Sequence, residues 1–403
     1  MHEKFKWILL PELVFFQEGP GVRNHQYTST GIKLLNVANL QGGMLYLDNT
    51  ERYISEDEAY GKYKHFLVDE GDLIIASSGI KVEYFDQKMG FAKKEHLPLC
   101  MNTSTIRFKT LDSNILNIRY FMYFLKSIFF KKQLARLITG SAQLNFGPSH
   151  LKQIKVPLPS IDYQIEIVNI LDQAQELIDK RKAQIKALDE LIQSVFNNMF
   201  GDVFLNRSGW KECFLEELCE EIVDCPHSTP IYSEGVTQYP CIRTSEISNG
   251  YIKWDSMKYL DEEEYFKRVK RLIPKPGDVV YAREGTFGDA IIIPNSTEMC
   301  LGQRVMLFRT KSDVNAVFFW GMIRSNGVYH QALNNTSGST VGHVNIKDIK
   351  KFKCLVVPLE LQNKFAEIVE SIEKQKELLN ESLVELEDNF NSLMQRVFKG
   401  QLF

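Results

Sequence analysis

The 403-residue sequence lacks the patterns of a secreted, disulfide-bonded or membrane-anchored protein. Its seven cysteines are odd in number and include no C-x-x-C pair, which argues against a disulfide framework and a zinc ribbon. Cys213, Cys219, Cys225 and His227 are too widely spaced for a structural zinc site, so no metal is expected. No uncharged apolar run reaches the ~18 residues of a membrane span. We therefore expect a cytoplasmic protein without signal peptide or membrane anchor.

Sequence signatures of common catalytic sites are also missing. There is no G-x-x-x-x-G-K-[ST] loop, no H-E-x-x-H pair and no N/D-P-P-Y/F motif for base methylation. The segment GSTVGH at 338–343 lacks the lysine that would reach a phosphate. We expect no catalytic residue and no cofactor in this chain.

Composition indicates an ordinary globular protein of more than one folding unit. Hydrophobic residues make up 44% of the sequence and charged residues 25%, which excludes a disordered chain. At 100–200 residues per domain, the length predicts two to four folding units. Because the net charge is only −3, any basic surface must be local.

The sequence repeats itself once, at a spacing of about 200 residues. LLNVANLQGGML at 34–45 matches PCIRTSEISNGYI at 240–252, and GDLIIASSG at 71–79 matches GDVVYAREG at 277–285. CMNTSTIRFKT at 100–110 matches CLGQRVMLFRT at 300–310. The offset falls from 207 to 198 along the chain, as it does when insertions and deletions collect in loops of a shared fold. The sequence therefore predicts two similar heads.

Each head is predicted to mix strands and helices. Short β-branched runs bounded by turn residues predict strands at 73–76, 279–282, 290–293 and 305–308. Apolar residues three and four apart predict helices at 121–138 and 317–333. Each head ends at a Pro-rich stop, at 156–159 or 356–358.

Two longer helical segments follow the heads. Apolar residues recur there at alternating steps of three and four over more than four heptads, a spacing that favours a coiled-coil seam over one helix of an ordinary bundle. Arg181 and Lys376 are the polar exceptions. The predicted seam is Ile167, Leu171, Ile178, Ile185, Leu188, Ile192, Phe365, Val369, Ile372, Leu379, Leu383, Leu386 and Phe390.

Connectivity predicts that the two helices are antiparallel. Only residues 201–209 separate the first helix from the second head, which must therefore begin near the far end of that helix. A second helix that packs along the first then runs back toward the first head. The predicted fold class is α+β, with two similar mixed α/β domains separated by two long antiparallel coiled-coil helices in a pseudo-two-fold arrangement.

Local basic runs and polar loop residues suggest binding surfaces. Lysines and arginines cluster at 267–275 and at 126–136, either as solvated helix faces or as phosphate contacts. The helices at 164–201 and 362–399 together carry −5, which leaves about +2 on the heads. Loop residues such as Arg243, Arg283 and Arg304 can bond two edges of a base, although such loop residues are also common turn formers.

The duplicated order of these landmarks resembles the DNA-sequence specificity subunit of type I restriction-modification systems. The resemblance covers nearly the whole chain and includes the I-x-N-G, G-D, Gly/Ser and P-L-P…Q landmarks together with DCPHSTP at 224–230. It implies a target recognition domain at 1–160, a spacer helix at 161–202, a second recognition domain at 203–360 and a second spacer helix at 361–403. The first head departs from the pattern, with SSGIKVEY where the second has REGTFGDA.

The resemblance implies that each head reads one half of an asymmetric bipartite site in double-stranded DNA, with the helices as a ruler. Two modification methyltransferase subunits would dock on the helices, and a motor-nuclease restriction subunit can join them. S-adenosylmethionine, ATP and Mg²⁺ then belong to the partners. The alternatives are a protein-binding scaffold with two similar heads, or the recognition subunit of a related two-component methylation and cleavage enzyme.

Equivalent loops of the two heads supply the predicted DNA-binding residues. In the first head they are Asn36, Asn39, Ser77, Ser78, Lys81, Asn102, Thr103, Ser104, Gln143 and Asn145. In the second head they are His227, Ser228, Thr229, Arg243, Thr244, Ser245, Arg283, Glu284, Thr286, Gln303, Arg304, His343 and Asn345.

Overall fold

The computed structural model describes residues 5–49, 51–80, 82–138, 144–285, 288–295, 297–337 and 343–401. The chain divides into two compact units, one formed by residues 1–180 with 383–403 and the other by residues 181–382. Each unit therefore contains one head and parts of both long helices. No helix in the described part of the chain is both long enough and apolar enough to cross a membrane.

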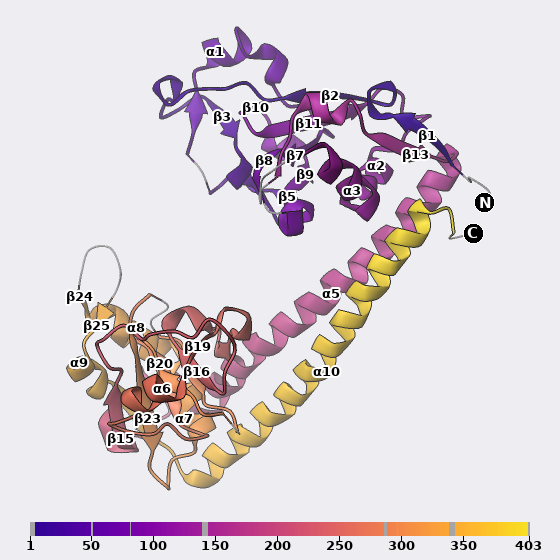
Figure 1. Cartoon of the computed structure of the whole chain (residues 1–403). Coiled ribbons are helices and arrows are strands. Elements are labelled where there is room, and N and C mark those ends of the chain that lie inside the picture. Colours follow the sequence, from indigo (N-terminus) through magenta and orange to yellow (C-terminus); the bar gives the residue numbers. More distant parts are fainter. Residues whose placement is uncertain are drawn as a thin grey trace. The chain divides into compact units, whose positions relative to one another are not determined.

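The first unit contains two main sheets (Figure 1). The four-stranded sheet has the order β2-β11-β7-β9 and the three-stranded sheet the order β10-β3-β6. The strands of these sheets and of the small pairs are β1 (Lys6–Leu9), β2 (Val14–Glu18), β3 (Ile32–Leu35), β4 (Leu40–Gln41), β5 (Met44–Leu45), β6 (Tyr53–Ile54), β7 (Leu73–Ala76), β8 (Ser78–Ile80), β9 (Met89–Phe91), β10 (Leu99–Met101), β11 (Thr105–Thr110), β12 (Leu144–Asn145) and β13 (Lys155–Leu158). The helices are α1 (Glu56–Tyr60), α2 (Ile118–Lys126), α3 (Ile128–Leu137), α4 (Pro148–Leu151) and α5 (Ile161–Phe200).

The second unit repeats this topology. Its sheets have the orders β15-β23-β20-β21 and β19-β16-β22, and β14 pairs with β26 as β1 pairs with β13. The strands are β14 (Lys211–Phe214), β15 (Cys219–Asp224), β16 (Tyr239–Ile242), β17 (Ile247–Ser248), β18 (Tyr251–Ile252), β19 (Lys258–Leu260), β20 (Val279–Ala282), β21 (Ala290–Ile292), β22 (Cys300–Leu301), β23 (Val305–Thr310), β24 (Thr336–Ser337), β25 (His343–Val344) and β26 (Lys353–Val356). The helices are α6 (Glu262–Arg268), α7 (Ala316–Ile323), α8 (Asn326–Asn334), α9 (Ile346–Lys350) and α10 (Leu359–Phe398). The predicted duplication and α+β fold class are confirmed.

The Gly-Asp landmark of each head has a structural role. Gly71 and Gly277 have φ of +84° and +87°, a conformation that favours glycine. The following aspartates are buried, and Asp278 accepts two hydrogen bonds from Arg309, at 2.9 and 2.7 Å. Asp72 lies 3.5 Å from the Arg107 guanidinium in the first head. The landmark therefore fixes a turn and a buried ion pair, not a ligand contact.

The predicted head helices are each interrupted once. The sequence predicts single helices at 121–138 and 317–333, but the structure has α2 and α3 in the first head and α7 and α8 in the second. Ser127 and Ser325 take extended backbone conformations and their hydroxyls cap the second helix of each pair. The prediction was wrong because a buried serine can satisfy a helix N-terminus without disturbing the apolar spacing.

The two long helices pack antiparallel inside each unit. In the first unit Leu171, near the start of α5, shares a core with Val397, near the end of α10. In the second unit Phe196, near the end of α5, contacts Phe365, near the start of α10, with ring centroids 5.5 Å apart. All thirteen predicted seam residues are buried or half-buried, which confirms the coiled-coil pattern.

The seam shifts by one residue at the end of α5. The heptad spacing continues to Val195 and Met199, which are only half-buried, whereas Phe196 and Phe200 are fully buried. A straight helix has 3.6 residues per turn, so a 3.5-residue pattern drifts around it by about 20° per heptad. The buried face therefore passes to the next residues, where the head supplies the packing partner Phe318.

Candidate nucleic-acid interface

Three chain segments meet at one edge of the second head. The backbone N–H of Arg283, which follows β20, donates to the carbonyl of Arg304 at 3.1 Å. The N–H of Val344 in β25 donates to the carbonyl of Arg283 at 3.2 Å, and Glu284 bridges to His343. These bonds bring together predicted residues that are up to 60 positions apart in the sequence.

We call this meeting point of three segments, held together by backbone hydrogen bonds, the junction of the head. The first head has an equivalent junction. Ser77 donates its N–H to the carbonyl of Ser104 at 2.8 Å, and Phe146 donates to Ser77 at 2.9 Å. Ser78 lies opposite Asn145 where β8 pairs with β12. The two predicted residue sets therefore occupy equivalent places in the two heads.

One residue in each junction has an unusual backbone conformation. Ser104 and Arg304 both have a φ of +66°, a left-handed conformation uncommon in residues other than glycine. The side chain of Arg304 is 60% exposed, and its Nε lies 2.9 Å from Glu284 Oε2. Strain of this kind concentrates at functional sites, and here it recurs at the same place in both heads.

Side-chain chemistry at this place differs between the heads. In the second head, Glu284 Oε1 lies 2.8 Å from His343 Nδ1, so the carboxylate joins an arginine and a histidine. In the first head, the Ser78 hydroxyl donates to the Ser104 hydroxyl at 2.6 Å. One fold thus presents charged groups in one head and neutral hydroxyls in the other.

A loop after β15 lies beside the junction of the second head. His227, Ser228 and Thr229 are exposed on it, and Gln303 Nε2 donates to Thr229 Oγ1 at 3.1 Å. Buried Arg268 holds the loop by donating to the carbonyls of Ser228 at 3.1 Å and Pro226 at 3.3 Å. The interpretation of the basic residues at 267–275 as one surface cluster is therefore wrong for Arg268, which is buried and positions this loop.

Arg283 lies inside the head rather than on its surface. Its side chain is 9% exposed, and its NH2 lies 3.2 Å from Asp224 Oδ1. His227 is 76% exposed and lies 3.5 Å from the other oxygen of Asp224. The DNA-binding role predicted for Arg283 therefore stays a prediction. The side chain of Arg304, in contrast, is exposed and accessible to a ligand.

The segment at 243–245 packs beside the same junction. Arg243 donates two hydrogen bonds to the buried carboxylate of Glu246, one of them at 2.9 Å, and this pairing raises the pKa of its guanidinium. A Cβ on Gly302 would lie 2.4 Å from Arg243 Cγ, so glycine permits this close packing. Thr244 lies near Gly285, and Ser245 is exposed.

Asparagines take the corresponding places in the first head. Asn39 is fully buried and accepts from the backbone N–H of Asn36 at 2.8 Å, as Glu246 accepts from Arg243 at 3.0 Å. Buried Asn102 accepts from the N–H of Val22 at 3.1 Å and donates to Asn36 Oδ1 at 3.0 Å. Asn39 and Asn102 thus shape the loops, while Asn36 is half-buried and Thr103 is exposed.

The first head has an exposed loop that the sequence analysis missed. The N–H of Gly19 donates to the carbonyl of Thr105 at 2.9 Å, as Cys225 donates to Val305 in the second head. The loop that follows exposes Arg23, Asn24 and His25. Their place after β2 matches that of His227–Thr229 after β15, and aligning the sequence of β2 with that of β15 would have found them.

Some predicted residues are not joined to these junctions. Lys81, Gln143 and Thr286 lie outside the described residues. Asn345 is exposed at the N-terminus of α9.

The basic run at 126–136 is only partly on the surface. Lys131 pairs with Asp86 at 2.8 Å, and burial raises the pKa of the Asp86 carboxyl. Of the other cations in this run, Lys126 is half-buried, whereas Lys132 and Arg136 are exposed.

The cysteine cluster considered for zinc is not assembled. Within the described residues, no group of three or more His, Cys, Asp and Glu side chains is placed to hold a metal ion. Burial raises the pKa of the Cys219 thiol to about 12, which opposes the thiolate form that binds metals.

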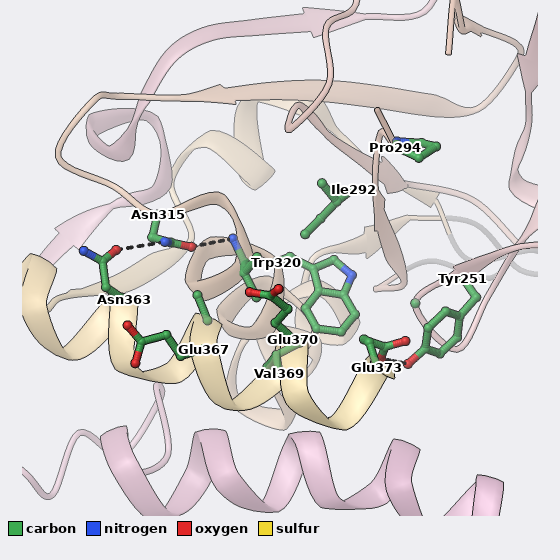
Figure 2. A pocket seen from close by; sticks show the side chains of 13 residues that line it. Tyr251, Ile292, Pro294, Asn315, Trp320, Asn363, Glu367, Val369, Glu370 and Glu373 are labelled. Atoms are coloured by element: carbon green, nitrogen blue, oxygen red, sulfur yellow. Dashed lines mark hydrogen bonds between the residues drawn. The ribbon is translucent and has the colours of Figure 1, made fainter. Parts of the chain in front are cut away.

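The second unit also has a groove along α10, shown in Figure 2. Its volume is about 750 Å³, and Ile292, Val317, Trp320 and Val369 supply apolar lining. Glu367, Glu370 and Glu373 lie along its α10 side (Figure 2). The groove is therefore apolar inside and acidic along one edge.

Comparisons with known proteins agree with this architecture. The Type I restriction modification DNA specificity domain matches residues 26–188 and again 207–388. The specificity subunit of the type I restriction enzyme MjaVIII from Methanocaldococcus jannaschii is 25% identical over 48% of this chain and 45% of its own length. The EcoKI specificity subunit from Escherichia coli K12 is 21% identical over 82% of this chain and 75% of its own length.

The fold also has a solved counterpart. A chain solved in work on complex assembly and conformational transition of the type I R-M system aligns with a TM-score of 0.58, at 15% identity, over 99% of this chain and 98% of its own length. The matched domain occurs twice and covers most of the sequence, in the two segments that the structure folds into similar heads. The chain therefore belongs to the family of type I restriction-modification DNA specificity subunits.

Proposed function

We propose that this chain reads an asymmetric bipartite site in double-stranded DNA, one half with each head. The observation that carries the proposal is the repeated junction: the same backbone hydrogen bonds assemble Ser77 with Ser104 in one head and Arg283 with Arg304 in the other. A duplicated fold with different side chains at one place suits two readers of unlike sequences.

Chemistry at the junctions supports base reading. Exposed Arg304 can donate two hydrogen bonds to a guanine edge, the commonest specific contact in the major groove. The hydroxyls of Ser78 and Ser104 can donate to or accept from either base of a pair. Exposed cations of the heads, Lys132, Arg136, Lys270 and Arg271, are available for phosphates.

The proposed partners are two modification methyltransferase subunits, with a restriction subunit as a further component. The long helices and the acidic groove of the second unit offer them a docking surface. A segment with an apolar side chain beside lysine or arginine would complement this groove. S-adenosylmethionine, ATP and Mg²⁺ would be supplied in the partners, and no catalytic role is assigned to this chain.

Methylome sequencing of a host that expresses the chain with a modification subunit from the same genome tests the proposal. We expect adenine methylation at one bipartite motif, and none when the chain is expressed alone. Methyl transfer by the isolated chain would contradict a specificity role. DNA binding that barely changes with salt would favour the protein-binding scaffold, because phosphate contacts release counterions.

A further inference from the structure

The second unit buries a lysine in the seam between its two long helices. Lys376 breaks the apolar heptad spacing of α10, yet it is only 6% exposed. Its ammonium bonds to Asp189 Oδ1 from α5 and lies 3.8 Å from Glu373 Oε1. The charge is therefore held inside the helix pair by a carboxylate from the opposite helix.

The head contributes to the same cluster through Tyr251 of β18. The Lys376 ammonium lies 3.5 Å from the centroid of the tyrosine ring. The Tyr251 hydroxyl donates to Glu373 Oε1 at 2.6 Å, an interaction drawn in Figure 2. Burial, followed by the bond to Glu373, raises the pKa of Tyr251 well above its ordinary value. One polar cluster thus joins α5, α10 and the head.

The described residues at the two key positions of the first unit do not repeat this cluster. The position equivalent to Lys376 is Ile178, which is buried, and the position equivalent to Tyr251 is Met44, which is 63% exposed. An apolar residue would fill the Lys376 position at lower desolvation cost. A buried polar pair at one seam position is a known means of fixing helix register at a cost in stability.

We propose that Lys376 is a positioning residue that selects one arrangement of α5, α10 and the second head. The inference rests on the proposed function in one respect: by seating the head on the helices, the cluster would restrict the gap between the two DNA half-sites. The apolar contacts in the seam tolerate small slides of one helix along the other. The Lys376 ammonium, in contrast, meets its partners in only one register.

The test replaces both charges by apolar residues, Asp189→Leu with Lys376→Met. Paired nitroxide labels at exposed positions report the arrangement, with Ala187→Cys and Ser371→Cys for the helices and Ala187→Cys with Ser256→Cys for the head. Cys213→Ser removes the half-buried thiol, since the other six native cysteines are buried. Lys374→Met is the matched control, because this lysine is exposed and pairs with Glu370 on its own helix.

We expect the double variant to unfold at the same or a higher temperature and to broaden both distance distributions. The control should leave both distributions narrow. Tyr251→Phe should broaden only the head distribution, and it covers the case in which the double variant fails to fold. Narrow distributions in these variants would overturn the proposal.

Methylome sequencing provides the second readout. The double variant, expressed with the modification subunit, should methylate sites whose gaps differ by one base pair from that of the original site. If the label distances broaden but methylation keeps the original gap between the half-sites, the link between the cluster and DNA spacing is overturned. If even the original chain supports no methylation, the proposed function fails, while the label distances still decide the positioning role.

Discussion

Gln164 and Gln362 make the same set of hydrogen bonds in the two units. Gln164 accepts from the backbone N–H of Asn117 at 2.8 Å, and Gln362 accepts from that of Asn315 at 2.8 Å. Each amide also donates to two carbonyls, those of Ile115 and Pro159 or those of Asp313 and Val357. The glutamine of the P-L-P…Q landmark thus ties the start of each long helix to the head that precedes it.

Gln164→Ala and Gln362→Ala should each lower the free energy of unfolding by about 1–3 kcal/mol, because each leaves buried backbone groups unpaired. Urea unfolding measures the loss, with Gln184→Ala as control, since that side chain is exposed. A loss no larger than the roughly 0.5 kcal/mol typical of surface changes would contradict the structural role.

The two junction arginines should behave differently when mutated. Arg304→Ala should cost about 1–3 kcal/mol of binding, selectively at one base pair, if its exposed guanidinium reads a guanine. Arg283→Ala should instead destabilise the head by about 3–5 kcal/mol, because it removes the buried cation that pairs with the Asp224 carboxylate.

Fluorescence anisotropy with single-base substitutions, together with thermal unfolding, separates the two effects. Lys270→Ala is the control for an exposed cation, and we expect it to weaken DNA binding equally on all sequences. The same equal weakening for Arg304→Ala would make that arginine a phosphate contact.

Replacement of residues 1–160 by the corresponding head of a relative should change one half of the DNA site only. The second head keeps its own sheets, core and junction within a separate unit, so its half-site should persist. Methylome comparison of the parent and the chimera measures this. A simultaneous change of both half-sites would show that the heads are not independent readers.

Charge reversal at the acidic groove should weaken assembly with the modification subunit. Glu367→Lys with Glu370→Lys reverses two charges on the groove edge, and we expect at least a tenfold loss of affinity that depends on salt. Glu377→Lys with Glu381→Lys is the matched control, because both residues are exposed on α10 outside the groove. Equal effects of the two pairs, measured by calorimetry, would rule out groove-specific docking.

Deletion of one heptad from each long helix should shorten the spacer between the heads. Removal of residues 178–184 and 379–385 keeps the seam phase, spares Lys376 and Asp189, and shortens each helix by about 10.5 Å. That length corresponds to about three base pairs, which also turn the duplex by roughly 100°.

Either a site with a shorter gap or lost binding is expected from that deletion, because the heads must still meet the same face of each half-site. Methylome sequencing and a binding series over gap lengths report the result. Unchanged affinity for the original site would show that the helices do not set the distance.

The sequence by itself determined the features that depend on repetition and periodicity. The match between 71–79 and 277–285 predicted two like heads, and the three-and-four spacing from Ile167 onward predicted the seam. Apolar periodicity reports burial directly, because one helix face must leave water, so these predictions needed no knowledge of distant contacts.

Only the tertiary structure decided which polar residues face solvent. Arg268 and Arg283 look like surface cations in the sequence, yet carbonyls from a distant loop and Asp224 hold them inside the head. Lys376 looked like an exception in a seam and is the centre of a buried cluster. A charged side chain is buried wherever partners far along the chain compensate its desolvation, and local sequence carries no record of those partners.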